Sequence, residues 1–92
     1  MNSDEQLAYR SLLRETFRET VKRLLADHGP LKTGQIYNHV RRLHADLCDD
    51  DIECAYGGEP EWKKQVRWAQ QDLKFRGEIE KIDGRWRIRR AT

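Results

Sequence analysis

The hydrophobic residues of the chain recur at helical spacing, most clearly between residues 60 and 77. The stripe in this segment consists of Trp62, Val66, Ala69 and Leu73, at positions i, i+4, i+7 and i+11. Such a stripe is the core-facing side of a helix with a period of about 3.6 residues. Pro60 suits a first helical turn and Gly77 a C-terminal stop, so the pattern predicts a helix over residues 61–76.

The opposite face of the same segment carries long polar side chains in a row. They are Lys64, Arg67, Gln71 and Lys74. Asp72 is the one acid in the second half of the segment, and it lies to the flank of this row. A row of donors is typical of a helix that lies in a DNA groove, where phosphates and base edges accept hydrogen bonds. The alternative is an ordinary solvated helix face.

A first helix is predicted over residues 3–28, with a stripe at the same period. This stripe consists of Leu13, Phe17, Val21, Leu24 and Leu25. Ser3 and Gln6 fit a capping box at the start of the helix. Gly29 and Pro30 are expected to end it, because neither residue is tolerated cheaply in a helix interior.

A second helix is predicted over residues 34–47, with Thr33 as its cap. Its stripe consists of Ile36, Val40, Leu43 and Leu47. Residues 31–32, between the first two helices, are long enough for a short extended piece and no more. Residues 48–59 form an acidic loop that leads into the third helix.

The end of the chain has the pattern of a β-hairpin. Residues 78–82 and 85–89 flank Asp83 and Gly84, a strong signal for a two-residue type I′ turn. The register that this turn fixes pairs Ile79 with Ile88, Lys81 with Trp86, Glu80 with Arg87 and Glu78 with Arg89. One face of the hairpin is therefore apolar, with the stem of Lys81 against the indole of Trp86. The other face is expected to carry two ion pairs.

This order of elements predicts an α+β, mostly helical fold with one domain over residues 1–92. Three helices, a short strand and a C-terminal two-stranded hairpin make a winged helix-turn-helix. In this variant of the helix-turn-helix, the third helix enters the major groove of DNA and the hairpin, or wing, contacts the backbone or the minor groove. A hairpin this short is marginal in water, so its apolar face is expected to pack on the helices.

The charge of the chain is unevenly distributed. The formal net charge of the 92 residues is +2. Residues 1–60 hold 8 Lys/Arg and 11 Asp/Glu, whereas residues 61–92 hold 10 Lys/Arg and 5 Asp/Glu, so the two parts carry −3 and +5. A basic C-terminal third favours a polyanionic partner. The sequence contains no transmembrane run and no signal peptide, so no membrane partner is expected and a cytoplasmic location is predicted.

One run of residues resembles a known family. It reads Trp62-x3-Val66-Arg67-x-Ala69-x3-Leu73-Lys74-x2-Gly77-x-Ile79 and closes on Gly84-Arg85-Trp86-Arg87-Ile88. This run resembles the winged-helix domains attached to restriction nucleases of the Mrr type, and it is similar to the winged helix of methyladenine-dependent restriction enzymes. Residues 30–37 fit the entry to the second helix of those domains, and the whole resemblance covers about residues 21–90.

The resemblance implies a partner and a setting. In those families the domain binds double-stranded DNA and directs a separate nuclease, so a restriction system is expected. N6-methyladenine is the first candidate for a modification that is read, and a nuclease domain or subunit is the expected protein partner. The chain departs from those families because it has no nuclease of its own, and it is either a free-standing module or one domain of a longer protein.

The candidate DNA-binding residues follow from side-chain chemistry. Arg67 suits a bidentate contact to guanine and Gln71 one to adenine, while Lys64 and Lys74 suit a base or a phosphate. A second basic cluster consists of Arg85, Arg87, Arg89 and Arg90. Arg87 is a candidate DNA contact. The alternative is that its charge is neutralised by Glu80, its cross-strand partner. Arg85 lies beside the predicted turn and is expected to contact a phosphate.

Trp68 is the remaining candidate contact. It shares the flank of the third helix with Phe75, seven residues further on. Such a pair most often covers a neighbouring element, here the first helix or the wing. The alternative is a stacking wall for a modified base, for which Trp68 is the first choice and Tyr56 in the preceding loop the second.

Other functions have weaker signals. His39, His44, Cys48 and Cys54 are candidate zinc ligands, but they lack the close ligand pair that is typical of zinc sites. The acids of the loop lack the glycine and the terminal glutamate of a calcium-binding loop. No cofactor is expected, the two cysteines are expected to be reduced thiols, and no nucleophile–base set indicates an enzyme. The rival function is a protein-interaction module with an apolar patch of Trp68, Phe75 and Ile82.

Overall fold

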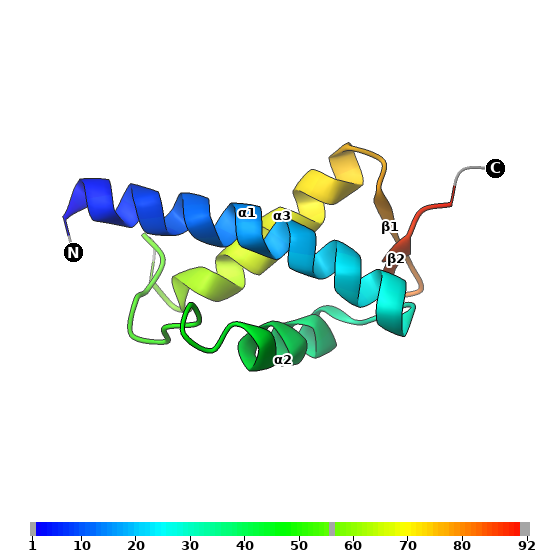
Figure 1. Cartoon of the computed structure of the whole chain (residues 1–92), viewed down its shortest axis with the longest axis horizontal. Helices are drawn as coiled ribbons and strands as arrows, with labels where there is room; N and C mark the ends of the chain where they lie inside the picture. Colours follow the sequence, from blue (N-terminus) through cyan, green and yellow to red (C-terminus); the bar gives the residue numbers. More distant parts are fainter. Residues whose placement is uncertain (1, 56, 91–92) are drawn as a thin grey trace.

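A computed structural model describes residues 2–55 and 57–90. The chain forms three helices followed by a two-stranded antiparallel hairpin (Figure 1). The elements are α1 (Ser3–His28), α2 (Thr33–Leu43), α3 (Glu61–Phe75), β1 (Ile79–Ile82) and β2 (Arg85–Ile88). The predicted class, α+β and mostly helical, is confirmed.

The long helix α1 spans most of the molecule, and α3 crosses it while α2 lies along one side (Figure 1). The stripes predicted for α1 and α3 are all buried and meet in one hydrophobic core, which also contains Ile36, Val40 and Ile79. Each stripe is buried because it packs on the others, which places the polar face of α3 on the outside. In the described part of the chain, no helix combines the length and the apolar character that crossing a membrane requires.

Helix α2 ends four residues earlier than predicted, at Leu43 rather than at residue 47. The chain turns at His44, whose Nε2 lies 2.7 Å from Thr20 Oγ1 of α1. Tyr9, also on α1, donates a hydrogen bond of 2.7 Å from its hydroxyl to the carbonyl of Leu47. These contacts hold the end of α2 against α1 and leave the Leu43 side chain 58% exposed, so the prediction that Leu43 belongs to the core is wrong.

Two predicted helix caps are displaced by one residue. Asn2, and not Ser3, caps α1, because its Oδ1 accepts a 2.8 Å hydrogen bond from the Glu5 amide. At α2 the N-cap residue is Lys32, whose amide donates to Gln35 Oε1 at 2.8 Å. Thr33 is already helical, and its hydroxyl forms hydrogen bonds to α3 and to the hairpin instead of capping α2.

The end of α3 is confirmed, with Gly77 directly after the last helical turn. Gly77 has φ of 74°, a left-handed conformation that glycine adopts without a Cβ penalty. The Glu78 amide donates to the Leu73 carbonyl at 2.9 Å, and the Gly77 amide donates to the Lys74 carbonyl at 3.0 Å. This pair of bonds is a Schellman motif, and it directs the chain from α3 into β1.

The hairpin has the predicted turn and register. Asp83 and Gly84 both have positive φ, 54° and 77°, as a type I′ turn requires. The cross-strand partners are Ile79 and Ile88, Glu80 and Arg87, Lys81 and Trp86, and Ile82 and Arg85. The ammonium of Lys81 lies 5.5 Å from the centroid of the Trp86 ring, in agreement with the expected contact.

One of the two predicted cross-strand ion pairs is wrong. Arg87 Nη2 lies 2.9 Å from Glu80 Oε1, as expected. The carboxylate of Glu78 instead binds Lys22 Nζ of α1 at 2.8 Å, and Arg89 contacts Glu78 through its backbone amide. The error arises because the prediction considered only the hairpin, whereas the packed hairpin brings Glu78 beside α1.

The hairpin is attached to the helices through Leu31 and Trp86. These two residues exchange backbone hydrogen bonds of 2.9 and 2.8 Å, so the predicted extended piece before α2 adds to the edge of β2. The Trp86 side chain is 2% exposed, and its Nε1 donates to Thr33 Oγ1 at 3.2 Å. The hairpin is therefore fixed to the start of α2 by both backbone and side chain.

Candidate nucleic-acid interface

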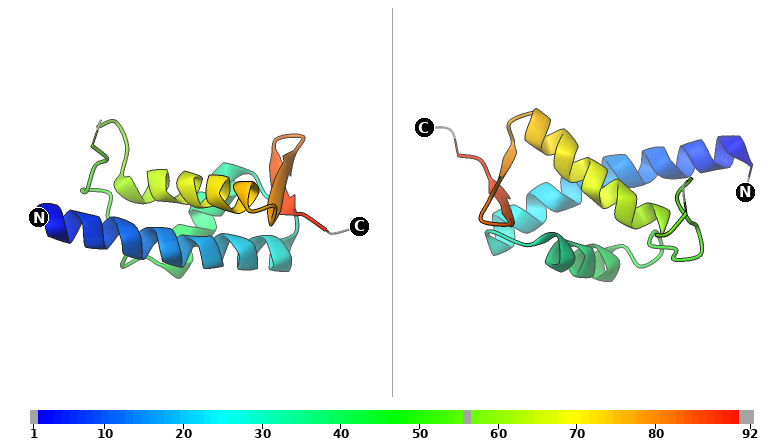
Figure 2. Two further views of the ribbon diagram at one scale, coloured as in Figure 1. Left: turned by 90° about the horizontal axis from the view of Figure 1, so that it is seen from above. Right: turned by 180° about the vertical axis from the view of Figure 1, so that it is seen from behind.

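The polar face of α3 is not covered by another helix. On the side away from α1, α3 lies between two projecting segments, the loop that joins it to α2 and the hairpin (Figure 2). Seen from behind in the same figure, α3 crosses in front of α1 and α2 runs below it. A ligand that reaches α3 therefore meets the loop at one end and the hairpin at the other.

Three of the four predicted reading residues share this surface. Arg67, Gln71 and Lys74 are exposed. Lys64 is turned toward α1, where its side chain is 22% exposed and its ammonium lies 3.8 Å from Glu61 Oε2. The structure thus brings together Arg67, Gln71 and Lys74 and leaves Lys64 at the edge of the surface.

Arg67 is held by two partners that the sequence analysis missed. Its Nη1 and Nη2 donate to the two carboxylate oxygens of Glu59 at 2.7 and 2.5 Å, and Nη1 lies 3.3 Å from the Tyr37 hydroxyl. The hydrogen bonds from Arg67 lower the pKa of Glu59, and those to Glu59 and Tyr37 raise the pKa of Arg67. Both groups remain charged near neutral pH. Glu59 and Arg67 do not belong to one helical repeat, so no local pattern pointed to this pair.

Lys63 and Tyr37 extend the surface toward α2. The Lys63 ammonium lies 5.6 Å from the centroid of the Tyr37 ring and 5.7 Å from that of Trp62. The Tyr37 ring meets the Trp62 ring edge-on, with 5.8 Å between centroids. Lys63 therefore adds a cation beside Arg67. Trp62 is buried, and its ring contacts both Lys63 and Tyr37.

The loop before α3 places negative charge at one end of the surface. Asp50 Oδ1 accepts hydrogen bonds from Trp62 Nε1 at 2.8 Å and from Arg41 Nη2 at 3.0 Å. The Cys54 amide donates to the Glu59 carbonyl at 3.0 Å, and the Glu61 amide donates to the Ile52 carbonyl at 2.7 Å. The loop is thus tied to the start of α3, at the end of the surface opposite the hairpin.

The cysteines and histidines of the loop region have other contacts. Burial raises the pKa of the Cys48 thiol to about 11, which disfavours the thiolate that metals bind. The Cys54 thiol donates to the Gly57 carbonyl at 3.2 Å. His39 stacks on His28 with 4.4 Å between ring centroids. Residues 2–55 and 57–90 contain no group of three side chains placed to hold a metal ion.

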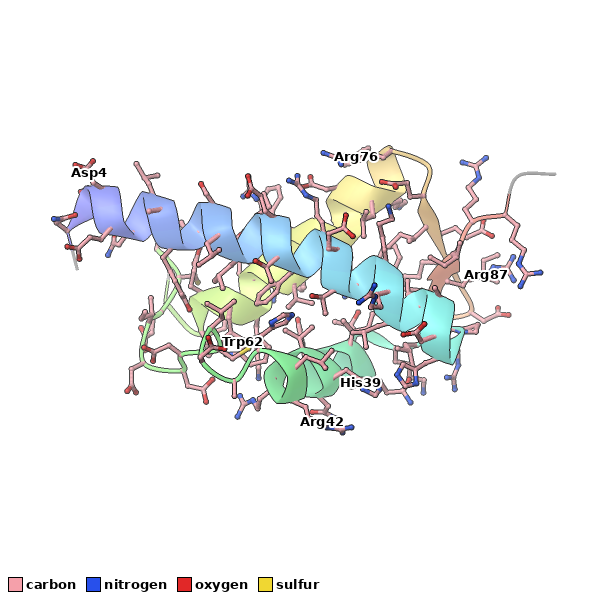
Figure 3. All side chains as sticks on the ribbon, in the orientation of Figure 1. Asp4, His39, Arg42, Trp62, Arg76 and Arg87 are labelled. Atoms are coloured by element: carbon pink, nitrogen blue, oxygen red, sulfur yellow. The ribbon has the colours of Figure 1, made fainter. Side chains whose placement is uncertain are left out.

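The hairpin arginines differ in their surroundings. Arg85, beside the turn, is exposed and forms no ion pair with another described residue. Arg87 is paired with Glu80 and, with Ala26 and Pro30, lines a groove. Figure 3 shows Arg87 at the end of the molecule, near the C-terminus of α1. Of the two predicted hairpin contacts, Arg85 is the one whose charge is unpaired.

The position of Trp68 is intermediate between the two that the sequence allowed, a ring that covers a neighbouring element and an exposed stacking wall. It is 48% exposed and, with Leu7 and Arg14 of α1, lines a groove of about 280 Å³ between α1 and α3. The guanidinium carbon of Arg14 lies 5.7 Å from the centroid of the Trp68 ring. Phe75 is 86% exposed, so it does not cover another element. Tyr56, the other candidate for this role, lies outside the described residues.

A polar ladder fixes α3 and the hairpin on α1. Its four rungs are Arg10–Glu61 at 3.0 Å, Arg14–Gln65 at 3.3 Å, Arg18–Asp72 at 3.5 Å and Lys22–Glu78 at 2.8 Å. The four cations stand at intervals of four residues on α1, a signal that was visible in the sequence but was not used. The ladder pairs Glu61 and Asp72, the acids on this flank of α3, with arginines of α1. The exposed charged side chains on the outer face of α3 are therefore mainly cations.

Comparisons with protein-family models, with curated proteins and with solved structures find no match to this chain.

Proposed function

We propose that the chain is a double-stranded DNA-binding module with the arrangement of a winged helix. In this proposal α3 enters the major groove and the hairpin lies on the backbone as the wing. The observation that carries it is the uncovered face of α3, where Arg67, Gln71 and Lys74 stand exposed between two projecting segments. Arg and Gln are the side chains that read guanine and adenine edges, and Lys suits a phosphate.

The distribution of charge supports one direction of approach. The acidic loop repels a phosphate backbone from the start of α3, whereas Lys74, Arg76 and Arg85 are exposed toward its end and the hairpin. The phosphate backbone is therefore expected to cross the end of α3 beside the turn of the hairpin, which leaves the bases to Arg67 and Gln71 in the middle of the helix. The module has no catalytic role in this proposal. It directs a nuclease domain or subunit in a restriction system, as the resemblance implies.

The first test is the dependence of binding on salt. Arg85→Ala is expected to weaken binding to all duplexes about equally and to lower the slope of log Kd against log salt by roughly 1, because one phosphate contact is lost. The measurement is fluorescence anisotropy on a labelled duplex at several salt concentrations. Arg23→Ala, which removes an exposed cation from α1, is the matched control and should leave the slope unchanged. Equal slopes for the wild type and Arg85→Ala contradict the phosphate role.

Recognition of N6-methyladenine is the finer part of the proposal. The half-exposed ring of Trp68 forms one wall of the groove between α1 and α3, and Leu7 adds apolar surface to it. One buried methyl group contributes about 0.8 kcal/mol, so a few-fold preference is expected for a methylated duplex. Trp68→Ala should abolish this preference in a competition between plain, hemimethylated and fully methylated duplexes. Equal affinity of the wild type for all three excludes methyl reading and leaves DNA binding in place.

A second candidate function is a protein-interaction module. The observation that favours it is the exposure of Trp68, Phe75 and Ile82, at 48%, 86% and 41%. Large exposed apolar side chains often mark an interface. The salt series separates the two functions, because an apolar interface is insensitive to salt whereas a phosphate interface weakens steeply.

A further inference from the structure

The guanidinium of Arg67 keeps one edge free although it is bound on two sides. Arginine has five N–H donors. Glu59 accepts from both terminal nitrogens, and the Tyr37 hydroxyl lies beside Nη1. The edge formed by Nε–H and the second Nη2–H has no hydrogen-bond partner among the described residues. This edge is a two-donor fork of the kind that binds O6 and N7 of guanine.

The two partners of Arg67 are themselves fixed from outside α3. The carbonyl of Glu59 accepts from the Cys54 amide at 3.0 Å, and the next residue, Pro60, pairs with Glu53 in a β-bridge. Tyr37 belongs to α2, and its ring packs edge-on against Trp62. A loop and a second helix thus hold the guanidinium of a residue that belongs to α3.

Charge at this point remains positive in spite of Glu59. The hydrogen bonds from Arg67, and to a lesser degree the charges of Lys63 and Lys64, lower the pKa of the Glu59 carboxylate. The charge of Glu59 is therefore compensated locally by Arg67 and Lys63, and the acids that repel a phosphate backbone are those earlier in the loop.

We propose that Glu59 and Tyr37 are positioning residues that fix Arg67 so that its free edge reads a guanine. The inference rests on the proposed DNA-binding function and deepens it, since it assigns specificity to a pair of residues outside α3. A free arginine side chain loses rotamer freedom when it binds a base, whereas a fixed one has already lost it. Specific binding should therefore depend on Glu59 and Tyr37, and non-specific binding should not.

The test measures base preference separately from affinity. Selection from a randomised duplex pool with the wild type identifies its preferred site. Affinities are then measured for that site and for the three other base pairs at each position. Four variants are compared: Arg67→Ala, Glu59→Gln, Tyr37→Phe and Glu53→Gln. The last is the matched control, because it removes one negative charge from the same loop at an exposed residue. Circular dichroism checks that each variant is folded.

The wild type is expected to prefer guanine at one position by roughly ten- to a hundredfold. Arg67→Ala should abolish this preference, and Glu59→Gln and Tyr37→Phe should each reduce it at least threefold. Their affinity for the duplex with the wrong base should stay the same or rise. Glu53→Gln should keep the full preference.

Three results overturn the inference. If Glu59→Gln strengthens binding to all four duplexes alike and leaves the preference intact, Glu59 shields Arg67 and does not position it. If Arg67→Ala retains the preference, another residue reads the base, and DNA binding itself still stands. If the wild type binds no duplex even at low salt, the proposed function fails, and this result is visible before any variant is made.

Discussion

Replacement of Trp86 by alanine should lower the free energy of unfolding by about 3–5 kcal/mol, the usual cost of emptying a buried tryptophan site. Trp86 is 2% exposed, and its indole donates to Thr33. It is also the residue through which β2 joins Leu31. The loss is a large part of the roughly 5–15 kcal/mol that stabilises a typical domain. Urea unfolding followed by circular dichroism gives the change from the shift of the midpoint.

Ile82→Ala is the control for this prediction. Ile82 belongs to the same hairpin but is 41% exposed, so its truncation should cost less than about 1 kcal/mol. If Trp86→Ala unfolds at nearly the same urea concentration as the wild type, the buried indole of the hairpin does not stabilise the core.

Arg10→Ala should destabilise the fold by about 3 kcal/mol, because it leaves a buried carboxylate without its principal cation. Glu61 is 1% exposed, and Arg10 Nε lies 3.0 Å from its Oε1. Gln65 also donates to Oε1, but Oε2 has no hydrogen-bond partner in the part of the chain that the structure describes, and Lys64 Nζ is 3.8 Å from it. The remaining contacts therefore replace only part of the lost interaction. The measurement is again the urea midpoint, at a pH where carboxylates are ionised.

Two further variants test the cause. Adding Glu61→Gln to Arg10→Ala removes the buried charge and should recover most of the lost stability, which a double-mutant cycle measures. Arg18→Ala breaks the Arg18–Asp72 rung, where both side chains are a quarter to a third exposed, and should cost less than about 1 kcal/mol. If Arg10→Ala costs no more than Arg18→Ala, the buried position of Glu61 does not make the loss of its cation costly.

Local periodicity was sufficient to predict the fold class and most of its elements. The stripes of α1 and α3 and the turn at Asp83 and Gly84 depend on residues close together in the sequence. The end of α2 was mispredicted because it depends on Tyr9 and Thr20 of α1, and apolar spacing alone carried the helix four residues too far. The partner of Glu78 was mispredicted for a similar reason, since Lys22 is brought beside it by packing.

The candidate site was predicted less completely than the fold. Its row of donors on α3 was visible, and three of the four stand together on one surface. Which of them remain free for a ligand was not visible, because Glu59 and Tyr37 reach Arg67 from a loop and from α2. Pairing of side chains between distant segments depends on how the elements pack, and the periodic patterns do not contain that information.

The pairing of Leu31 with Trp86 has a consequence for the order of events in folding. Trp86 and Thr33 are hydrogen-bonded although they are 53 residues apart in the chain. A two-stranded hairpin is marginal alone, so β1 and β2 are expected to become stable only after α1 and α2 have set Leu31 in place. Until then the helices present an unpaired backbone edge and an empty indole site, and contacts of such long sequence separation form slowly. The hairpin, which follows the three helices in the chain, thus completes the core.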